Sequence, residues 1–162
     1  MKILFTLLIT FFSFVTFSQT DTNFTDKKGL KQGLWIEKHP SIITETYYKD
    51  NLKNGVYKSY YTTTGKLYGL GEYKTNKPIG KWLTFDESGH LWNEETNIEI
   101  LINDNKYKYK SYVKYFDKFG NIEQEGSIKY FDSMLDGDKD GLWKFNKDGK
   151  TSEKTYLNGR PK

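Results

Sequence analysis

Short runs of aromatic and β-branched residues alternate with turns rich in glycine, asparagine and aspartate along most of the chain. A unit built from these runs begins with a glycine, any residue and an aromatic. Its leading pairs are Gly33 and Trp35, Gly55 and Tyr57, Gly80 and Trp82, and Gly141 and Trp143. A degenerate copy has Lys110 in place of the glycine, so the units start at positions 33, 55, 80, 110 and 141. This spacing indicates one small supersecondary unit repeated in tandem.

Each unit predicts a β-hairpin, because two short segments rich in Tyr, Trp, Phe, Ile and Thr flank a turn signal and helical periodicity is absent. Turns between hairpins are expected where the next unit starts, at residues 54–55, 78–80 and 140–141. The sequence therefore predicts an all-β fold, an elongated antiparallel meander of tandem hairpins. The array is expected over residues 29–159, with a short tail at 160–162.

Residues 97–116 depart from the unit and predict an extended hairpin. Ile98, Ile100 and Ile102 alternate with other residues, a polar turn follows, and Tyr107 and Tyr109 then share one face with period two. The opposite face of the second strand carries Lys108, Lys110 and Lys114. These lysines form either a basic stripe that binds anionic lipid headgroups or a solvated face protected against edge-to-edge pairing.

An apolar segment precedes the repeats. Lys2 is followed by residues 3–17, whose only polar members are Thr and Ser, and Ser18 completes a small-residue cleavage site. A helix of this length rises about 22 Å, which is short of a hydrocarbon core of about 30 Å. We expect a cleaved signal peptide at 1–18 and a flexible segment at 19–28. An uncleaved membrane anchor is the alternative.

Composition narrows the functional classes. The 162 residues contain no cysteine, which excludes disulfides, cysteine metal sites, cysteine nucleophiles and a lipid anchor after the cleavage point. The formal net charge of +4 is too mild for a nucleic-acid-binding protein. Only His39 and His90 are available for histidine chemistry, and the adjacent Glu94 and Glu95 point to opposite faces of a strand. We therefore expect neither catalysis nor nucleic-acid binding, and a core built from rings, since aromatics reach 17%.

Residues 136–141 resemble the first half of a calcium-binding loop. Asp136, Asp138 and Asp140 occupy its first, third and fifth positions, and Gly141 supplies the sharp turn. Lys147 stands at the twelfth position, where a helical calcium loop carries a bidentate Glu. Two interpretations stay open: a calcium site completed by a backbone carbonyl and water, or a polar turn between repeats.

Trp92 is the best candidate for a sugar-binding side chain, because an indole face stacks on the apolar face of a pyranose. It follows the motif residue Leu91, so alternation turns it to the other face of the sheet. Tyr107 and Tyr109 on the extended hairpin are expected nearby. Alternatively, Trp92 covers the second face of a thin sheet.

The repeat unit resembles a known family. The residues that carry the resemblance include Gly80, Trp82, Phe85, Gly89, Leu91 and Glu94. Their pattern is similar to the MORN repeat and to its bacterial variant, which is often labelled as an antitoxin component of a toxin-antitoxin system. The resemblance spans residues 29–159 and implies a twisted, largely single-layer sheet that serves as a scaffold. Eukaryotic MORN proteins are associated with membranes, lipids and protein scaffolding.

These features predict a non-catalytic exported protein, periplasmic or secreted, that binds another envelope or extracellular protein. The alternatives are a glycan- or lipid-headgroup-binding module and an antitoxin- or immunity-like protein. No resident cofactor is expected apart from the calcium ion considered above.

Overall fold

The computed structural model describes residues 22–131 and 136–162 of the chain. The signal peptide predicted at 1–18 and its cleavage point lie outside the described residues. The segment predicted as flexible at 19–28 includes a two-residue strand, Phe24–Thr25. Among the described residues there is no helix with the length and apolar character to cross a membrane.

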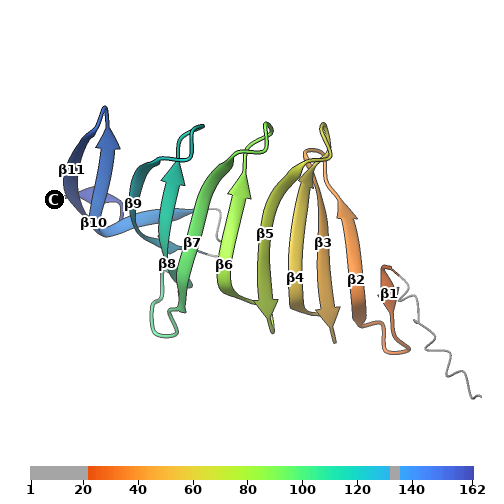
Figure 1. Ribbon diagram of the computed structural model, residues 1–162. Coiled ribbons are helices and arrows are strands. Elements are labelled where there is room, and N and C mark those ends of the chain that lie inside the picture. Colours follow the sequence, from red (N-terminus) through yellow and green to blue (C-terminus); the bar gives the residue numbers. More distant parts are fainter. Residues whose placement is uncertain (1–21, 132–135) are drawn as a thin grey trace, which may run out of the picture.

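The described residues form one 12-stranded antiparallel sheet whose strand order follows the sequence (Figure 1). The strands are β1 (Phe24–Thr25), β2 (Lys31–Lys38), β3 (Ile42–Lys49), β4 (Leu52–Tyr61), β5 (Leu67–Lys74), β6 (Lys77–Phe85), β7 (Leu91–Ile100), β8 (Tyr109–Phe116), β9 (Ile122–Tyr130), β10 (Gly137–Lys147), β11 (Lys150–Leu157) and β12 (Arg160–Pro161). β1 and β11 lie near opposite ends of the array (Figure 1). The predicted all-β antiparallel meander is confirmed.

The turns between hairpins lie earlier than predicted. The β3–β4 turn is Asp50-Asn51 and the β5–β6 turn is Thr75-Asn76, and all four residues have positive φ between 52° and 65°. Two-residue turns in which both residues have positive φ match the twist of the flanking strands. Among residues other than glycine, Asn and Asp tolerate this left-handed conformation best. The expected turns at 54–55, 78–80 and 140–141 are wrong, because those residues lie inside β4, β6 and β10.

The motif glycines instead form bulges within these strands. The β5–β6 pairing moves from Leu70 opposite Leu83 to Glu72 opposite Ile79, so residues 80–82 face Gly71 alone. Residues 141–143 of β10 face Gly126 of β9 in the same way. Gly80 and Gly141 have φ of 69° and 74°, which L side chains rarely adopt. The bulge explains why a glycine precedes the aromatic by two positions.

In the degenerate unit, the residue with positive φ is not the one at the motif glycine position. At Lys110 the bulge lies on the neighbouring strand, where the β7–β8 pairing moves from Thr96 opposite Tyr112 to Glu99 opposite Lys110. Asn97, within this bulge, takes a φ of 53°. Lys110 is therefore free of the conformational requirement that selects glycine in the other copies.

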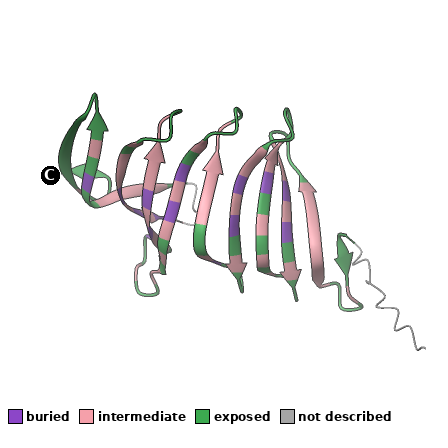
Figure 2. Cartoon of the chain, in the orientation of Figure 1, coloured by how far each residue is buried: buried purple, intermediate pink, exposed green. Residues whose placement is uncertain are grey.

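Most buried side chains lie in the middle strands of the sheet, whereas β1 and β11 are largely exposed (Figure 2). Val113, Ile128, Tyr130 and Trp143 form the buried apolar cluster. Small polar residues share the buried positions with these larger groups, as Thr46 and Ser111 show. We call this face of the sheet the inner face, since its rings cover the backbone of neighbouring strands.

The extended hairpin is shorter than the sequence pattern suggests. β7 ends at Ile100 and β8 begins at Tyr109, so Ile102 and Tyr107 lie in the connecting loop. Ile102 is 85% exposed, whereas Tyr107 is 2% exposed. The loop is anchored by Asp104, whose carboxylate accepts hydrogen bonds from the backbone N–H groups of Lys106 and Tyr107.

Candidate functional site

Two adjoining cavities lie on the inner face. The central cavity, of about 250 Å³, is lined by Tyr68, Thr84, Trp92, Asn93, Glu95, Tyr115, Ile128, Tyr130 and Gly137. The N-terminal cavity, of about 280 Å³, is lined by Glu37, His39, Thr44, Thr46, Lys53, Tyr57, Tyr68, Tyr73, Trp82, Thr84 and Glu95. Tyr68, Thr84 and Glu95 line both cavities, so the two cavities are neighbours, and their lining residues extend from β2 to β10. We call the two cavities together the trough.

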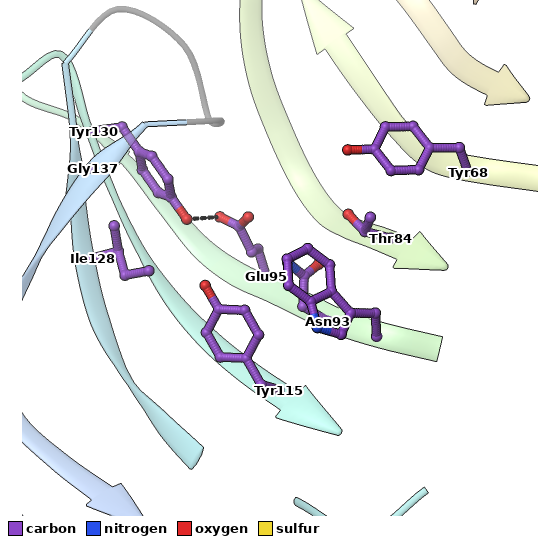
Figure 3. Close-up of a pocket in the computed structure, with 9 residues that line it drawn as sticks. Tyr68, Thr84, Asn93, Glu95, Tyr115, Ile128, Tyr130 and Gly137 are labelled. Atoms are coloured by element: carbon purple, nitrogen blue, oxygen red, sulfur yellow. Dashed lines mark hydrogen bonds between the residues drawn. The ribbon is translucent and has the colours of Figure 1, made fainter. Parts of the chain in front are cut away.

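Glu95 is the most unusual residue of the central cavity (Figure 3). Glu95 is only 5% exposed. Its Oε2 accepts hydrogen bonds from Ser111 Oγ at 2.7 Å and from Tyr130 Oη at 2.8 Å. No Lys, Arg or His nitrogen of the described residues lies within ion-pair distance of it. Burial raises the pKa of the Glu95 carboxyl, and the hydrogen bonds from Ser111 and Tyr130 partly oppose this rise.

Other polar groups converge on the same cavity. Asn93 is 7% exposed, and its Oδ1 accepts no hydrogen bond from the described residues. The hydroxyl groups of Tyr115 and Tyr130 point toward Glu95, and that of Tyr68 points in from β5 (Figure 3). Burial, followed by the charge of Glu95, raises the pKa of Tyr115 to about 12. The cavity is thus walled by rings and supplies hydrogen-bond acceptors.

Trp92 reaches this cavity through a bulge. The β6–β7 pairing moves from Thr84 opposite Asn93 to Phe85 opposite Leu91, which leaves Trp92 as the extra residue. Its side chain is 51% exposed, and its ring meets Tyr115 edge to face with centroids 5.6 Å apart. Trp92 therefore lies at the mouth of the cavity that Glu95 closes.

The tyrosines expected beside Trp92 lie elsewhere. Tyr109 pairs with Ile100 and Tyr115 pairs with Asn93, so the β7–β8 ladder separates Tyr109 from Trp92 by nearly its whole length. The Tyr107 hydroxyl donates to Asp138 Oδ2 at 2.6 Å, and the Tyr107 ring packs on Phe131 with centroids 5.2 Å apart. The expectation that Tyr107 and Tyr109 lie near Trp92 is wrong, because the register places them at the far end of the hairpin.

The three lysines do not form an uncompensated basic stripe. Lys108 is exposed in the loop, and Lys110 lies 3.6 Å from Asp140. Lys114 is flanked across the ladders by Glu94 on β7 and Glu125 on β9. Acidic residues on adjacent strands therefore lie beside Lys110 and Lys114, which weakens the case for lipid headgroups.

The calcium-loop pattern lies on a strand instead of a loop. Gly137–Lys147 is β10, with Asp138 opposite Lys129 and Asp140 opposite Ser127. Asp138 accepts hydrogen bonds from Tyr107 and from Lys106 Nζ at 3.2 Å, and Asp140 lies 3.3 Å from Lys129 Nζ. Asp136 precedes the strand and is exposed. No group of three or more His, Cys, Asp or Glu side chains in the described ranges is arranged to hold a metal ion.

Sequence reasoning placed Trp92 in the site but missed the residues behind it. From the sequence, Glu95 is a candidate only for catalysis, Tyr115 is only part of an alternating aromatic face, and Asn93 and Tyr130 match no motif. The signal lay in the alternation of β7, because Asn93 and Glu95 occupy the positions that face the rings of β8 and β9. Glu94 points to the other face and forms an ion pair with Lys81 at 2.9 Å, as alternation predicts.

Comparisons of the chain with protein-family models, curated proteins and solved structures find no match. The resemblance to MORN repeats therefore stays a prediction.

Proposed function

We propose that this chain is a non-catalytic, exported interaction protein that binds an extended segment of an envelope or extracellular partner protein along the trough of its inner face. The observation that carries the proposal is the extent of the trough. The two cavities share three lining residues and cross nine strands, from β2 to β10. At about 4.8 Å per strand, the sheet from β2 to β10 is roughly 40 Å wide, so an extended segment can lie across it and place side chains in both cavities.

The chemistry of the trough also favours a protein partner. Its walls carry tryptophan and tyrosine rings, which are the residues that contribute most to protein–protein binding. The rings are held in place by one another, since the centroid of Trp82 lies 5.4 Å from that of Tyr57 and 4.9 Å from that of Tyr73. Such a prearranged surface loses little side-chain entropy when a partner binds.

Photo-cross-linking from two matched tyrosine positions tests this proposal. A benzophenone amino acid replaces Tyr68, which lines the trough, or Tyr47, which is 44% exposed and faces the other way from Thr46. Tyr68 should capture a partner from the native envelope or medium with a yield that saturates and that unlabelled protein competes away. Equal yields from both positions, or no capture from Tyr68, would contradict the proposal.

Export itself is proposed from the apolar residues 3–17 and the small residues that follow. The protein recovered from the periplasm or medium should begin at Gln19. A mature protein that retains residues 1–18 would exclude a cleaved signal peptide, and intact-mass measurement distinguishes the two.

A glycan-binding module is the second candidate, and the position of Trp92 favours it. The half-exposed indole stands at the mouth of the central cavity beside the amide of Asn93 and the carboxylate of Glu95. A ring next to such groups can stack on a sugar while they accept hydrogen bonds from its hydroxyls. Titration with envelope oligosaccharides should then shift Trp92 fluorescence, and Trp92→Ala should abolish binding.

A further inference from the structure

Several aromatic clusters of this protein hold a lysine ammonium group. Lys31 Nζ lies 4.1 Å from the Trp35 ring centroid and 4.8 Å from that of Tyr48. Lys139 Nζ lies 4.1 Å from the Trp143 centroid and 4.7 Å from that of Phe145. An ammonium placed over an aromatic face is attracted by the ring quadrupole.

The same lysines also contact an oxygen acceptor. Lys31 Nζ lies 2.7 Å from Glu37 Oε1, and Lys139 Nζ donates to Gln124 Oε1 at 2.7 Å. The inner face therefore uses one arrangement more than once: two or more rings, one side-chain oxygen and an ammonium group between them.

The central cavity has the rings and the oxygens of this arrangement but no lysine. Trp92 and Tyr115 supply an edge-to-face ring pair, and Glu95 supplies a carboxylate. Neither Lys, Arg nor His is among the residues that line the cavity, and no described lysine lies over the Trp92 or Tyr115 ring.

The acceptors of the central cavity suit an ammonium group. Glu95 Oε2 is engaged by Ser111 and Tyr130, whereas Oε1 accepts no hydrogen bond from the described residues. Asn93 Oδ1 is buried and also lacks a donor. An ammonium group has three N–H donors and no acceptor, so it can satisfy both oxygens and neutralise the carboxylate.

We propose that the central cavity binds the protonated amino group of a ligand, with Glu95 and Asn93 as acceptors and the Trp92–Tyr115 ring pair as the wall. This inference rests on the proposed function and names the partner group that enters the trough: a lysine side chain of the partner protein. A free alkylamine offers the same chemistry and is the second source to distinguish.

Binding of small probes to the full purified protein tests the inference. The probes are N-acetyl-lysine methylamide, its norleucine analogue, which lacks the ammonium group, and butylamine, followed by NMR shifts of the Trp92 indole N–H. The lysine probe should bind at least about tenfold more tightly than the norleucine probe. If the lysine probe binds more tightly than butylamine, the site recognises a lysine within a peptide. If the two bind equally, the site recognises the ammonium group alone. Both outcomes support the site.

Glu95→Gln should reduce the affinity for the lysine probe at least about tenfold and leave the norleucine probe unchanged. Glu94→Gln is the matched control, because Glu94 is the adjacent carboxylate but pairs with Lys81 on the opposite face. The Glu94→Gln variant should bind the lysine probe with the same affinity as the unmodified protein. The comparison of lysine with norleucine needs no variant, so it decides the question even if Glu95→Gln does not fold.

Two results would overturn the inference. One is equal affinity for the lysine and norleucine probes. The other is a change in the NMR signal of the Trp92 indole N–H on addition of a methyl glycoside but not of the lysine probe. Failure of this inference is separable from failure of the proposed function. Capture of a partner at Tyr68 without lysine-probe binding removes only the ammonium site, whereas absence of a captured partner removes the function itself.

Discussion

Gly71 and Gly126 each lie directly beneath an indole ring of the following strand. A Cβ on Gly71 would lie 2.2 Å from the Trp82 ring, and a Cβ on Gly126 would lie 2.5 Å from the Trp143 ring. Neither glycine has positive φ, so space and not backbone freedom selects glycine at these two positions. The two rings can therefore lie flat on the sheet only because the opposing residue has no side chain.

Gly71→Ala should lower the free energy of unfolding by about 1–3 kcal/mol, because the methyl group displaces the Trp82 ring from its neighbours. Urea denaturation measures this change. In a Trp82→Leu background the same substitution should cost much less, since the smaller side chain can move aside. An equal cost in both backgrounds would show that the indole is not what the methyl group meets.

Glu95 makes the stability depend on pH in an unusual direction. Burial raises the pKa of Glu95 above its ordinary value of 4.5, so the folded protein holds this proton to higher pH than the unfolded chain does. Between the two pKa values the folded state binds more protons, and stability therefore falls as pH rises through that window. Carboxyls with lowered pKa, such as Asp117, act in the opposite direction.

Glu95→Gln isolates this contribution, because all other carboxyls are common to the two proteins. The free energy of unfolding of the variant minus that of the unmodified protein should increase from pH 4 to pH 8. Parallel urea denaturation at both pH values measures the difference. A difference that stays constant or decreases would mean that the ionised Glu95 is not destabilising in the folded protein.

At the scale of the strand, the recurring device is a bulge that needs one residue of positive φ. Glycine supplies it in β6 and β10, and Asn97 supplies it in β7. Because Asn97 is exposed, its contribution comes mainly from its backbone conformation. This allows the requirement of the bulge to be measured apart from side-chain packing.

Asn97→Val should destabilise the protein by about 1–2 kcal/mol, because a β-branched residue is strained at positive φ. Asn97→Gly should stay within about 0.5 kcal/mol of the unmodified protein or exceed it. Glu99→Val is the control on the same strand, exposed and with ordinary φ, and is expected to change stability little. Similar losses for both valine variants would argue against a strained bulge at Asn97.

The strands could be predicted from the sequence, but their turns and register could not. Alternation and β-branched composition placed the strands, and the sequence order of the strands followed from short turns. The motif glycines cannot be assigned from the sequence, because Gly is typical of both turns and bulges and only the cross-strand pairing distinguishes the two. Register also explains why Trp92 lines the central cavity while Tyr107 and Tyr109 lie at the far end of the hairpin.

At the scale of the whole molecule, the protection of backbone amides from hydrogen exchange should be uneven, because the sheet has two ends. β1 and β12 contain two residues each, and nearly all of β11 is exposed. Amide hydrogens of β11 should therefore exchange at least about tenfold faster than those of β8, which lies between two full-length strands. Hydrogen exchange with mass spectrometry measures this, and uniform protection along the chain would contradict it.

The candidate site was only partly predictable, since it depends on how residues from six strands meet. Burial of Glu95 without a cation follows from the register of β7, β8 and β9, which places Ser111 and Tyr130 beside it. No short motif encodes this arrangement. The calcium-loop pattern shows the converse: its Asp138 and Asp140 lie on a strand, where lysines and a tyrosine of neighbouring elements contact their carboxylates.

Because every strand of the described residues pairs only with its neighbours in sequence, the array can change length without changing its pairing scheme. Gain or loss of one hairpin moves the rest of the chain by two strands, about 10 Å, and restores both chain direction and the face on which each ring lies. Gain or loss of a single strand would reverse every later strand. Duplication or deletion in steps of two strands is thus the change in length that this sheet accommodates without reversing any later strand.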